Sequence, residues 1–355
     1  LGTVGVVTPL GEIALKHTTP DPIEIHRLLA QLKRDGIDHL ALEASSHGLD
    51  QFRLDGVEIA ACGFTNITRD HMDYHADFEH YLRAKLRLFG EVVREGGLAV
   101  VNADAAYADR FVAAAKTHGL TVMTVGEQGD TIRLLSREGR LDGQTLKLRH
   151  GNRDVTVSLP LAGNFQASNA LVAAALVIGL GGDADKVFAA LEHLKGAPGR
   201  LEKVAVAASG APVYVDYAHT PDSLEKVLAA IRPHVTGRLH VVFGCGGDRD
   251  KGKRPLMGEA AANNADVVIV TDDNPRTEDA AAIRSQALAG APGAREIGDR
   301  ALAIRESIAA LGAGDILIIA GKGHETGQIV GGEVRPFSDR NEAVKAALSL
   351  GGRAA

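Results

Sequence analysis

Short apolar runs alternate with amphipathic segments through the first half of the chain. The predicted strands are 40–42, 60–64 and 98–101, and the predicted helices are 22–34, 78–94, 164–180 and 184–194. Such alternation favours a mostly parallel sheet flanked by helices. Between 131 and 159 the pattern changes to short alternating segments broken by glycines, which predicts a small antiparallel β extension.

A break at 195–199, Lys-Gly-Ala-Pro-Gly, separates this half from the next because these residues cannot continue a helix. The predicted domains are therefore 1–197 and 198–355. In the second domain we predict strands at 213–215, 239–243, 267–270 and 316–319, with helices that start near Pro221, Pro255, Asp279, Asp299 and Asp339. The pattern indicates an α/β protein whose second domain is Rossmann-like and doubly wound.

Composition narrows the class of protein. The chain has 355 residues, 45% of them hydrophobic, which is enough for a sizeable core. A net charge of −6 argues against a nucleic-acid partner, and the longest apolar stretches fall short of the about 20 residues that cross a membrane. The first residues do not resemble a secretory signal, and the two cysteines give no disulfide framework. We expect a cytoplasmic protein and a monomer.

Polar motifs follow two predicted strands of the first domain. The segment 43–49, Glu-Ala-Ser-Ser-His-Gly-Leu, could hold Mg²⁺ or bind phosphates and carboxylates, although a polar turn explains it more simply. The segment 65–75 is dense in ionisable groups, and its Asp70 and His71 could ligate a metal. Lys85, in the middle of a helix, is by itself most simply a solvated lysine.

The second domain repeats this arrangement. Asp216 ends a predicted strand and stands beside His219 and the predicted helix cap Thr220, so a ribose or phosphate could bind there. The segment 244–254 combines glycines with four cations within six residues, which suits an anion, although it matches neither G-x-G-x-x-G nor G-x-x-x-x-G-K-[ST]. A solvated basic turn is the alternative.

Two further strand ends suit an amino acid. Arg276 follows Pro275 in Asp-Asn-Pro-Arg, and its planar guanidinium can grip a carboxylate with two hydrogen bonds. Glu325, in Gly-Lys-Gly-His-Glu, could bind an ammonium group. Together the two side chains would recognise a zwitterion.

Taken in order, these motifs closely resemble the MurE Mur ligases over essentially the whole chain. The match rests on segments 43–49, 66–75, 216–221, 244–254, 273–276 and 321–325. The resemblance implies a ligase that uses ATP and Mg²⁺ to phosphorylate the carboxylate of UDP-MurNAc-L-Ala-D-Glu. The amine of meso-2,6-diaminopimelate then attacks the acyl phosphate, which yields an amide and ADP for peptidoglycan synthesis.

The resemblance also implies roles for individual residues. Glu43, His71 and Lys85 would be catalytic and bind Mg²⁺, with Lys85 as a carbamate. Contacts to the UDP-peptide are implied for Thr18, Thr19, Ser45, Gln51 and Arg53, and contacts to ATP for Asn169, Arg200, Asp216 and His219. The diaminopimelate site would comprise Arg249, Asp273, Asn274, Pro275, Arg276, Gly321 and Glu325.

Some features depart from the family pattern. His17 and Gln166 stand where some relatives carry Asn, and the chain holds neither the G-x-x-x-x-G-K-[ST] loop nor a UDP-binding N-terminal domain. We therefore expect a fragment. The alternatives are a module that binds the amino acid without turnover, a lysine-adding ligase of the same family, and a folylpolyglutamate-synthetase-like ligase, against which the Asp-Asn-Pro-Arg motif argues.

Overall fold

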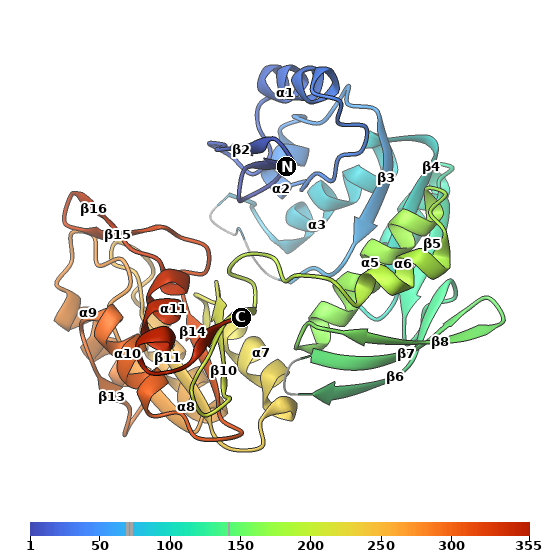
Figure 1. Ribbon diagram of the computed structural model, residues 1–355. Coiled ribbons are helices and arrows are strands. Elements are labelled where there is room, and N and C mark those ends of the chain that lie inside the picture. Colours follow the sequence, from blue (N-terminus) through green and yellow to red (C-terminus); the bar gives the residue numbers. More distant parts are fainter. Residues whose placement is uncertain (69–70, 72–73, 141–142) are drawn as a thin grey trace. The chain divides into compact units, whose positions relative to one another are not determined.

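The computed structural model describes residues 1–68, 71, 74–140 and 143–355. They form two compact units (Figure 1). The first comprises Leu1–Ser136, Leu146–Val157 and Ala167–Leu191, and the second comprises Arg137–Thr145, Ser158–Gln166 and Glu192–Ala355.

A sheet with the strand order β3-β4-β5-β6-β7-β8 organises the first half of the chain. These strands are β3 (Ile59–Phe64), β4 (Val93–Asn102), β5 (Thr121–Gly126), β6 (Ile132–Arg140), β7 (Gly143–His150) and β8 (Arg153–Leu159). Strands β3 to β6 pair in parallel. Only two residues join β7 to β8. Such a short connection can join antiparallel strands but not parallel ones, so β7 and β8 are antiparallel. The predicted β extension is confirmed.

Helices cover both faces of this sheet because side chains alternate along β3. Cys62 and Phe64 pack with α3 (Phe78–Arg87) and α4 (Ala108–Thr117) in one apolar cluster. Gly63 points the other way, where a Cβ atom would lie 3.0 Å from Val172 of α5 (Asn164–Gly179). The other elements of this half are β1 (Val6–Thr8), β2 (Gly11–Ile13), α1 (Pro22–Arg34), α2 (Ser46–Asp50), a π-helical turn (Leu88–Val92) and α6 (Ala184–Leu191).

The second unit is built on a sheet with the order β13-β12-β11-β14-β10-β9-β17. Its strands are β9 (Glu202–Val206), β10 (Pro212–Asp216), β11 (Leu239–Phe243), β12 (Val267–Val270), β13 (Arg295–Glu296), β14 (Ile316–Ala320) and β17 (Arg353–Ala354). Strands β10 to β14 pair in parallel, while β9 pairs antiparallel with β10 and with the edge strand β17. The loops that leave β10, β11, β12 and β14 therefore emerge at one edge.

Alternating side chains again divide the core between the two faces of this sheet. Ile316 and Ile318 pack with α7 (Pro221–Ile231), α8 (Lys253–Asn264) and α9 (Ala280–Leu288). Leu317 and Ile319 pack with α10 (Arg300–Ala309) and α11 (Asp339–Ser349). A 3₁₀ turn (Arg232–His234) and a hairpin of β15 (Gly327–Val330) and β16 (Glu333–Pro336) complete the unit. The doubly wound arrangement is confirmed.

Three predicted elements are wrong or too long. Residues 40–42 form no strand: this segment and Glu43 make two hydrogen bonds to Leu1, and Leu40 is 40% exposed. The helix predicted over 78–94 ends at Arg87, because a π-helical turn follows and β4 begins at Val93. The helix predicted over 184–194 ends at Leu191.

Candidate functional site

In the first unit a web of hydrogen bonds holds the predicted UDP-peptide residues around the start of α2. Ser45 caps this helix, since its Oγ accepts a hydrogen bond of 3.0 Å from the Gly48 amide. The Thr19 hydroxyl donates to the Glu43 carbonyl and accepts from the Ser45 amide, both over 3.0 Å. Thr18 contacts Thr3, which donates to Glu43. The structure thus brings Thr18, Thr19 and Ser45 together.

Gln51 and Arg53 join the same web from the other end of α2. Arg53 donates to the Thr19 carbonyl over 2.8 Å and to Oε1 of Gln51 over 2.6 Å. The Gln51 amide donates to the Tyr74 hydroxyl over 3.0 Å, which in turn donates to Asp50 over 2.8 Å. The two predicted substrate contacts are therefore held in fixed positions by their neighbours.

The three predicted Mg²⁺ ligands come from different segments of the first unit. Oε2 of Glu43 accepts hydrogen bonds from the amide and hydroxyl of Thr3, while Oε1 accepts none within the described part of the chain. Lys85 donates to the carbonyl of Ala44, the neighbour of Glu43, over 3.2 Å. The His71 ring lies 5.0 Å from that of His47, and its φ of 56° is left-handed. Asp70 lies outside the described residues.

The chemistry of these groups fits Mg²⁺ in part. The available oxygen of Glu43 is the hard ligand that Mg²⁺ prefers, and a carbamate on Lys85 would add oxygen ligands near it. An unmodified lysine ammonium cannot ligate a cation.

In the second unit three of the four predicted ATP residues, Arg200, Asp216 and His219, gather near the end of β10. The carboxylate of Asp216 accepts hydrogen bonds from the amides of Leu201 and Ala218, over 2.6 and 2.8 Å. Burial raises its pKa, against the opposing effect of these amides. Arg200 lies over the Tyr217 ring at 5.2 Å, and the Nδ1–H of His219 donates a hydrogen bond of 2.8 Å to the Tyr217 carbonyl. Asn169 belongs to the first unit, on α5.

At the ends of β12 and β14, Asn274 links the two predicted amino-acid motifs. Its Nδ2 donates to Oε2 of Glu325 over 3.0 Å, and its Oδ1 accepts from the Lys322 ammonium over 2.9 Å. Lys322 also donates to Glu325 over 2.8 Å. Burial raises the pKa of Glu325, but the hydrogen bond and charge of Lys322 outweigh burial, so the pKa lies below its ordinary value. Glu325 is therefore held as a carboxylate.

Arg276 lies beside this junction in a left-handed backbone conformation, with φ of 51°. Its amide donates to Ile329 and its carbonyl accepts from Gly331, so the β15–β16 hairpin supports the strained residue. Its Nη1 donates to the Gly247 carbonyl over 2.8 Å. A Cβ atom on Gly246 would lie 2.9 Å from that Nη1 and 3.8 Å from Cγ of Arg249, so the two predicted arginines flank one glycine.

The buried Asp273 and Gly321 pack against each other in the same region. Burial raises the pKa of Asp273, while Arg300 and Lys322 oppose the shift. A Cβ atom on Gly321 would lie 2.8 Å from Oδ2 of Asp273, and the φ of Gly321 is 115°, so glycine is required there. The turn of Pro275 is held by the amide of Gly247, which donates to Asn274. The predicted diaminopimelate residues therefore share one edge of the sheet.

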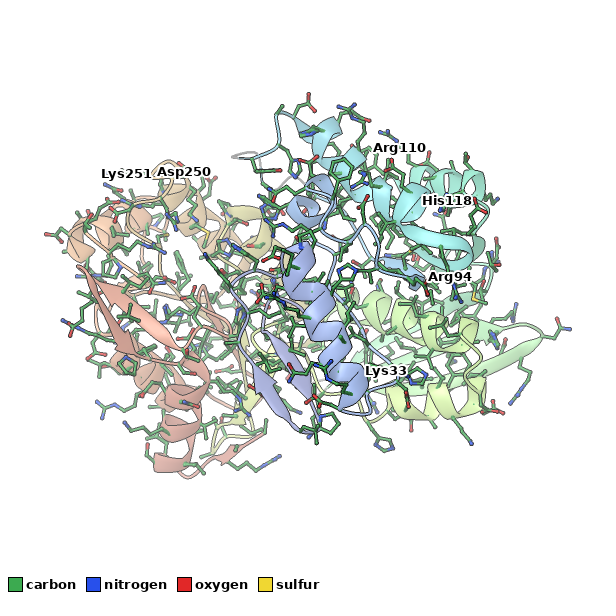
Figure 2. The ribbon with its side chains drawn as sticks, turned by 90° about the horizontal axis from the view of Figure 1, so that it is seen from above. Lys33, Arg94, Arg110, His118, Asp250 and Lys251 are labelled. Carbon is green, nitrogen blue, oxygen red and sulfur yellow. The ribbon has the colours of Figure 1, made fainter. Side chains whose placement is uncertain are left out.

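The basic loop after β11 has a more structural role than its charge suggests. Asp250 and Lys251 project from it (Figure 2), and Asp250 accepts a hydrogen bond of 2.8 Å from the Gly252 amide. The fully buried Arg254 pairs with Glu278 over 2.8 Å. Arg254, one of the four cations of the predicted anion-binding loop, therefore holds the loop in place.

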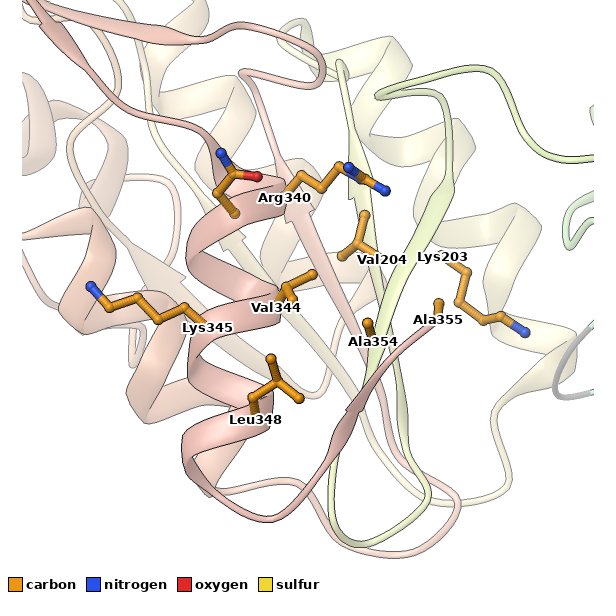
Figure 3. Close-up of a pocket in the computed structure, with 9 residues that line it drawn as sticks. Lys203, Val204, Arg340, Val344, Lys345, Leu348, Ala354 and Ala355 are labelled. Atoms are coloured by element: carbon orange, nitrogen blue, oxygen red, sulfur yellow. The ribbon is translucent and has the colours of Figure 1, made fainter.

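The described residues also line a pocket between α11, β9 and β17, with Lys203, Arg340 and Lys345 around an apolar floor (Figure 3). It contains none of the predicted site residues. Within the part of the chain that the structure describes, every helix is too short or too polar to cross a membrane.

Sequence reasoning missed residues that support the site from a distance. Arg300 donates to the carbonyls of Asp272 and Ala320, which directly precede Asp273 and Gly321. Lys322 is fully buried, and its place between two glycines at a strand end is the sequence signal for this internal cation. Asp50, His75 and His80 form a further cluster.

Comparison with known proteins assigns the family. The Mur ligase middle domain matches residues 1–177, and the glutamate ligase domain of Mur ligases matches residues 199–323. The UDP-N-acetylmuramoyl-L-alanyl-D-glutamate–2,6-diaminopimelate ligase of Bradyrhizobium diazoefficiens is 59% identical over 98% of this chain and 72% of its own length. The ligase of the same name from Agrobacterium fabrum is 54% identical, over 98% and 71%.

A solved structure agrees with these sequence matches. It is described as UDP-N-acetylmuramoyl-L-alanyl-D-glutamate–2,6-diaminopimelate ligase, is 37% identical, and superposes with a TM-score of 0.71 over 98% of this chain and 72% of that one. The order of domains, the fold of both units and the sequence identity all agree. The chain belongs to the MurE group of the Mur ligase family.

Proposed function

We propose that this chain joins meso-2,6-diaminopimelate to UDP-N-acetylmuramoyl-L-alanyl-D-glutamate at the expense of ATP. The relatives described above are named as ligases of this kind, and the similarity to them favours diaminopimelate over a folate-type substrate. The reaction is a step of peptidoglycan precursor synthesis. Because both substrates and ATP are soluble small molecules, and both cysteines are buried free thiols, we also propose a cytoplasmic location.

The observation that supports the amino-acid substrate most directly is the junction at Asn274. Asn274 contacts both the carboxylate of Glu325 and the guanidinium of Arg276. The two side chains come from the loops after β14 and β12, the strands on either side of β11. Oε1 of Glu325 accepts no hydrogen bond from the described residues, so it is available to a substrate ammonium. Arg276 would bind the distal carboxylate of diaminopimelate, which lysine lacks.

Other residues would act on the phosphate side of the reaction. Arg200 and His219 lie against the Tyr217 ring, which offers an aromatic face beside charged groups for a nucleotide, and Asp216 directly precedes Tyr217. Glu43, His71 and a carbamylated Lys85 would hold Mg²⁺, which neutralises charge on the phosphoryl oxygens. Thr18, Thr19, Ser45, Gln51 and Arg53 would orient the UDP-peptide carboxylate through the hydrogen bonds around α2.

Carbamylation has its own test. A ¹³C-bicarbonate NMR experiment should give a carbamate signal with the wild-type chain and none with Lys85→Arg, because a guanidinium does not react with CO₂ at neutral pH. An identical signal in both proteins would place the carbamate elsewhere.

Calorimetric titration with meso-diaminopimelate and with L-lysine tests the substrate. We expect Arg276→Ala to weaken diaminopimelate binding about 10- to 100-fold, because hydrogen bonds to a charged group contribute about that much to affinity. Lysine binding should stay unchanged, since lysine has no distal carboxylate. The matched control is Arg305→Ala, an exposed arginine of α10. If Arg276→Ala still preferred diaminopimelate as strongly as the wild type, the role of Arg276 would be wrong, and the lysine-adding alternative would gain support.

Turnover is measured separately. ADP release that depends on all three substrates would support the ligase activity of the 355-residue chain. Diaminopimelate binding without any ADP release would support the alternative in which the chain only binds the amino acid.

A further inference from the structure

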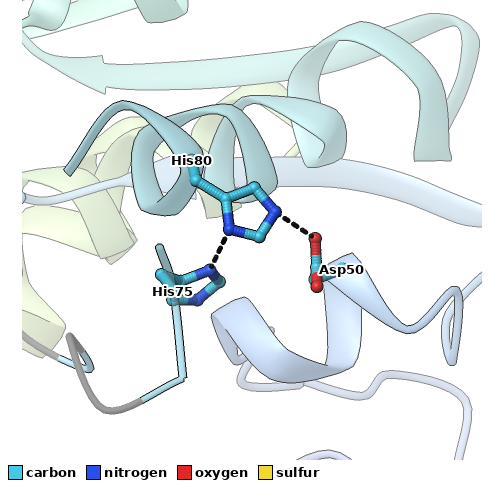
Figure 4. A group of neighbouring side chains, drawn as sticks. All are labelled: Asp50, His75 and His80. Atoms are coloured by element: carbon cyan, nitrogen blue, oxygen red, sulfur yellow. Dashed lines mark hydrogen bonds and ion pairs between the residues drawn. The ribbon is translucent and has the colours of Figure 1, made fainter. Parts of the chain in front are cut away.

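Three potential metal ligands outside the predicted Mg²⁺ set converge in the first unit (Figure 4). Asp50 ends α2, His80 lies in the first turn of α3, and His75 lies in the segment just before that helix. One ligand atom from each of the three residues lies within 4.8 Å of the other two. A tetrahedral zinc site with bonds of about 2.0–2.2 Å has ligand atoms about 3.3 Å apart. Movements of about an ångström would therefore close the cluster around an ion.

One of the separations already has this value. Nε2 of His80 lies 3.3 Å from Oδ1 of Asp50. His75 faces the other nitrogen of that ring, since its Nδ1 lies 3.4 Å from Nδ1 of His80, so His75 must move toward Asp50 for the three residues to face one ion. Tyr74 donates to the other oxygen of Asp50 over 2.8 Å, which orients the carboxylate. A ligand held in place by such a hydrogen bond loses less freedom when it binds a cation.

Protein groups alone leave this cluster incompletely satisfied. A neutral His80 has one ring proton, and if Nε2 donates it to Asp50, then Nδ1 must accept from His75. Nε2 of His75 then has a lone pair with no hydrogen-bond partner among the residues that the structure describes, although the residue is only 1% exposed.

The cluster is also accessible to an ion. The side chains of His80 and Asp50 are 35% and 26% exposed, so they leave an open side where water can complete the coordination. Two imidazoles and one carboxylate suit Zn²⁺ and neighbouring transition metals, whereas Mg²⁺ prefers oxygen ligands.

We propose that Asp50, His75 and His80 form a binding site for a divalent transition-metal ion of the Zn²⁺ class, separate from the Mg²⁺ ligands predicted at Glu43, His71 and Lys85. The ion would tie α2 to α3. Since Asp50 and Gln51 both contact Tyr74, it would also fix the segment that carries the predicted UDP-peptide contacts. This inference concerns metal binding alone and does not depend on the proposed reaction.

Calorimetric titration of the metal-free chain with Zn²⁺, in the presence of excess Mg²⁺, tests the site. We expect one Zn²⁺ per chain, and at least about tenfold weaker binding in His80→Gln and in Asp50→Asn. Loss of a residue that only hydrogen-bonds to a metal ligand already lowers metal affinity about 10- to 100-fold, so loss of a ligand should cost at least as much. Co²⁺ should give the visible absorption of a low-symmetry site in the wild type, and this absorption should be lost in both variants.

Two controls locate the ion. Glu43→Gln changes a predicted Mg²⁺ ligand and His193→Gln removes an exposed histidine of the other unit, so both should bind Zn²⁺ like the wild type. The proposal is overturned if the wild type does not bind Zn²⁺, if His80→Gln binds it as tightly as the wild type, or if only Glu43→Gln loses it. Circular dichroism of each variant checks that the comparison is between folded proteins.

Discussion

Arg300 and Asp339 are 39 residues apart in the chain, yet their side chains share two hydrogen bonds of 2.7 Å and neither is exposed to solvent. Arg300 also donates to the carbonyls of Asp272 and Ala320. The pair thus ties α10 and α11 to the two strand ends from which the predicted amino-acid site begins.

Removing one partner of this pair should be costly. Asp339→Ala leaves the guanidinium of Arg300 buried without its counter-ion, and we expect the free energy of unfolding to fall by about 3–5 kcal/mol. Urea unfolding measures it. Arg335→Ala is the control, because its ion pair with Glu333 is more than half exposed and should contribute less than about 1 kcal/mol. Equal losses in the two variants would contradict a special role for the buried pair.

A second prediction concerns the close approach of two loops. A Cβ atom on Gly247 would lie 1.9 Å from the carbonyl oxygen of Pro275, so Gly247→Ala must push the loop after β11 away from the loop that carries Arg276. We expect at least about tenfold weaker diaminopimelate binding in calorimetry, since a displacement of this size breaks the Arg276 contact to Gly247. Gly332→Ala is the control, as nothing lies within 4 Å of its Cβ position. Unchanged diaminopimelate affinity in Gly247→Ala would contradict the prediction that the close approach of the two loops positions Arg276 for binding.

Protonation of Glu278 at low pH should remove the stabilisation that this carboxylate gives to the basic loop after β11. Its hydrogen bond with Arg254, and then that with the Asp248 amide, lower the pKa of Glu278 from its ordinary 4.5 to about 2. Because the folded-state pKa is the lower one, the stabilisation is complete above about pH 4.5 and is lost as the pH falls toward about 2. The midpoint of urea unfolding should therefore fall less between pH 6 and pH 3 in Glu278→Gln than in the wild type. A parallel fall in both proteins would exclude this carboxylate as a source of acid sensitivity.

Both thiols should be unreactive in the folded protein. Burial raises the pKa of Cys62 and of Cys245 to about 12. At pH 8 the thiolate fraction is then on the order of 10³-fold lower than for an ordinary cysteine, so reaction with a disulfide reagent should be slower by at least that factor. Absorbance of the released thiolate measures the rate, and denatured protein supplies the reference. Rapid labelling of either folded thiol would show that the structure around it opens readily.

The sequence predicted most of the fold because the elements that matter are strongly patterned. The helix Pro22–Arg34 has the predicted bounds, and Thr220 caps α7 through a reciprocal bond with Ser223, as its position before Pro221 suggested. The failures have local causes. The apolar run at 40–42 predicts a strand, but a strand needs a continuous ladder of hydrogen bonds, and the two bonds to Leu1 do not make one.

The candidate site was less accessible to sequence reasoning. Motifs at strand ends could be recognised because parallel strands bring their carboxyl ends to one edge. Long-range partners could not: nothing in the local pattern pairs Arg300 with Asp339, or His80 with Asp50, since such contacts depend on how helices dock. The burial of Lys322 was equally hidden, because lysine is seldom fully buried.

Arg276 and Val330 form an isolated parallel bridge, so the backbone of the residue proposed to select the substrate is anchored by a surface hairpin. Substitutions in β15 or β16 can shift the guanidinium without altering any group that touches the amino acid. Substrate preference can thus change through substitutions in a hairpin that lies outside the Asp-Asn-Pro-Arg motif.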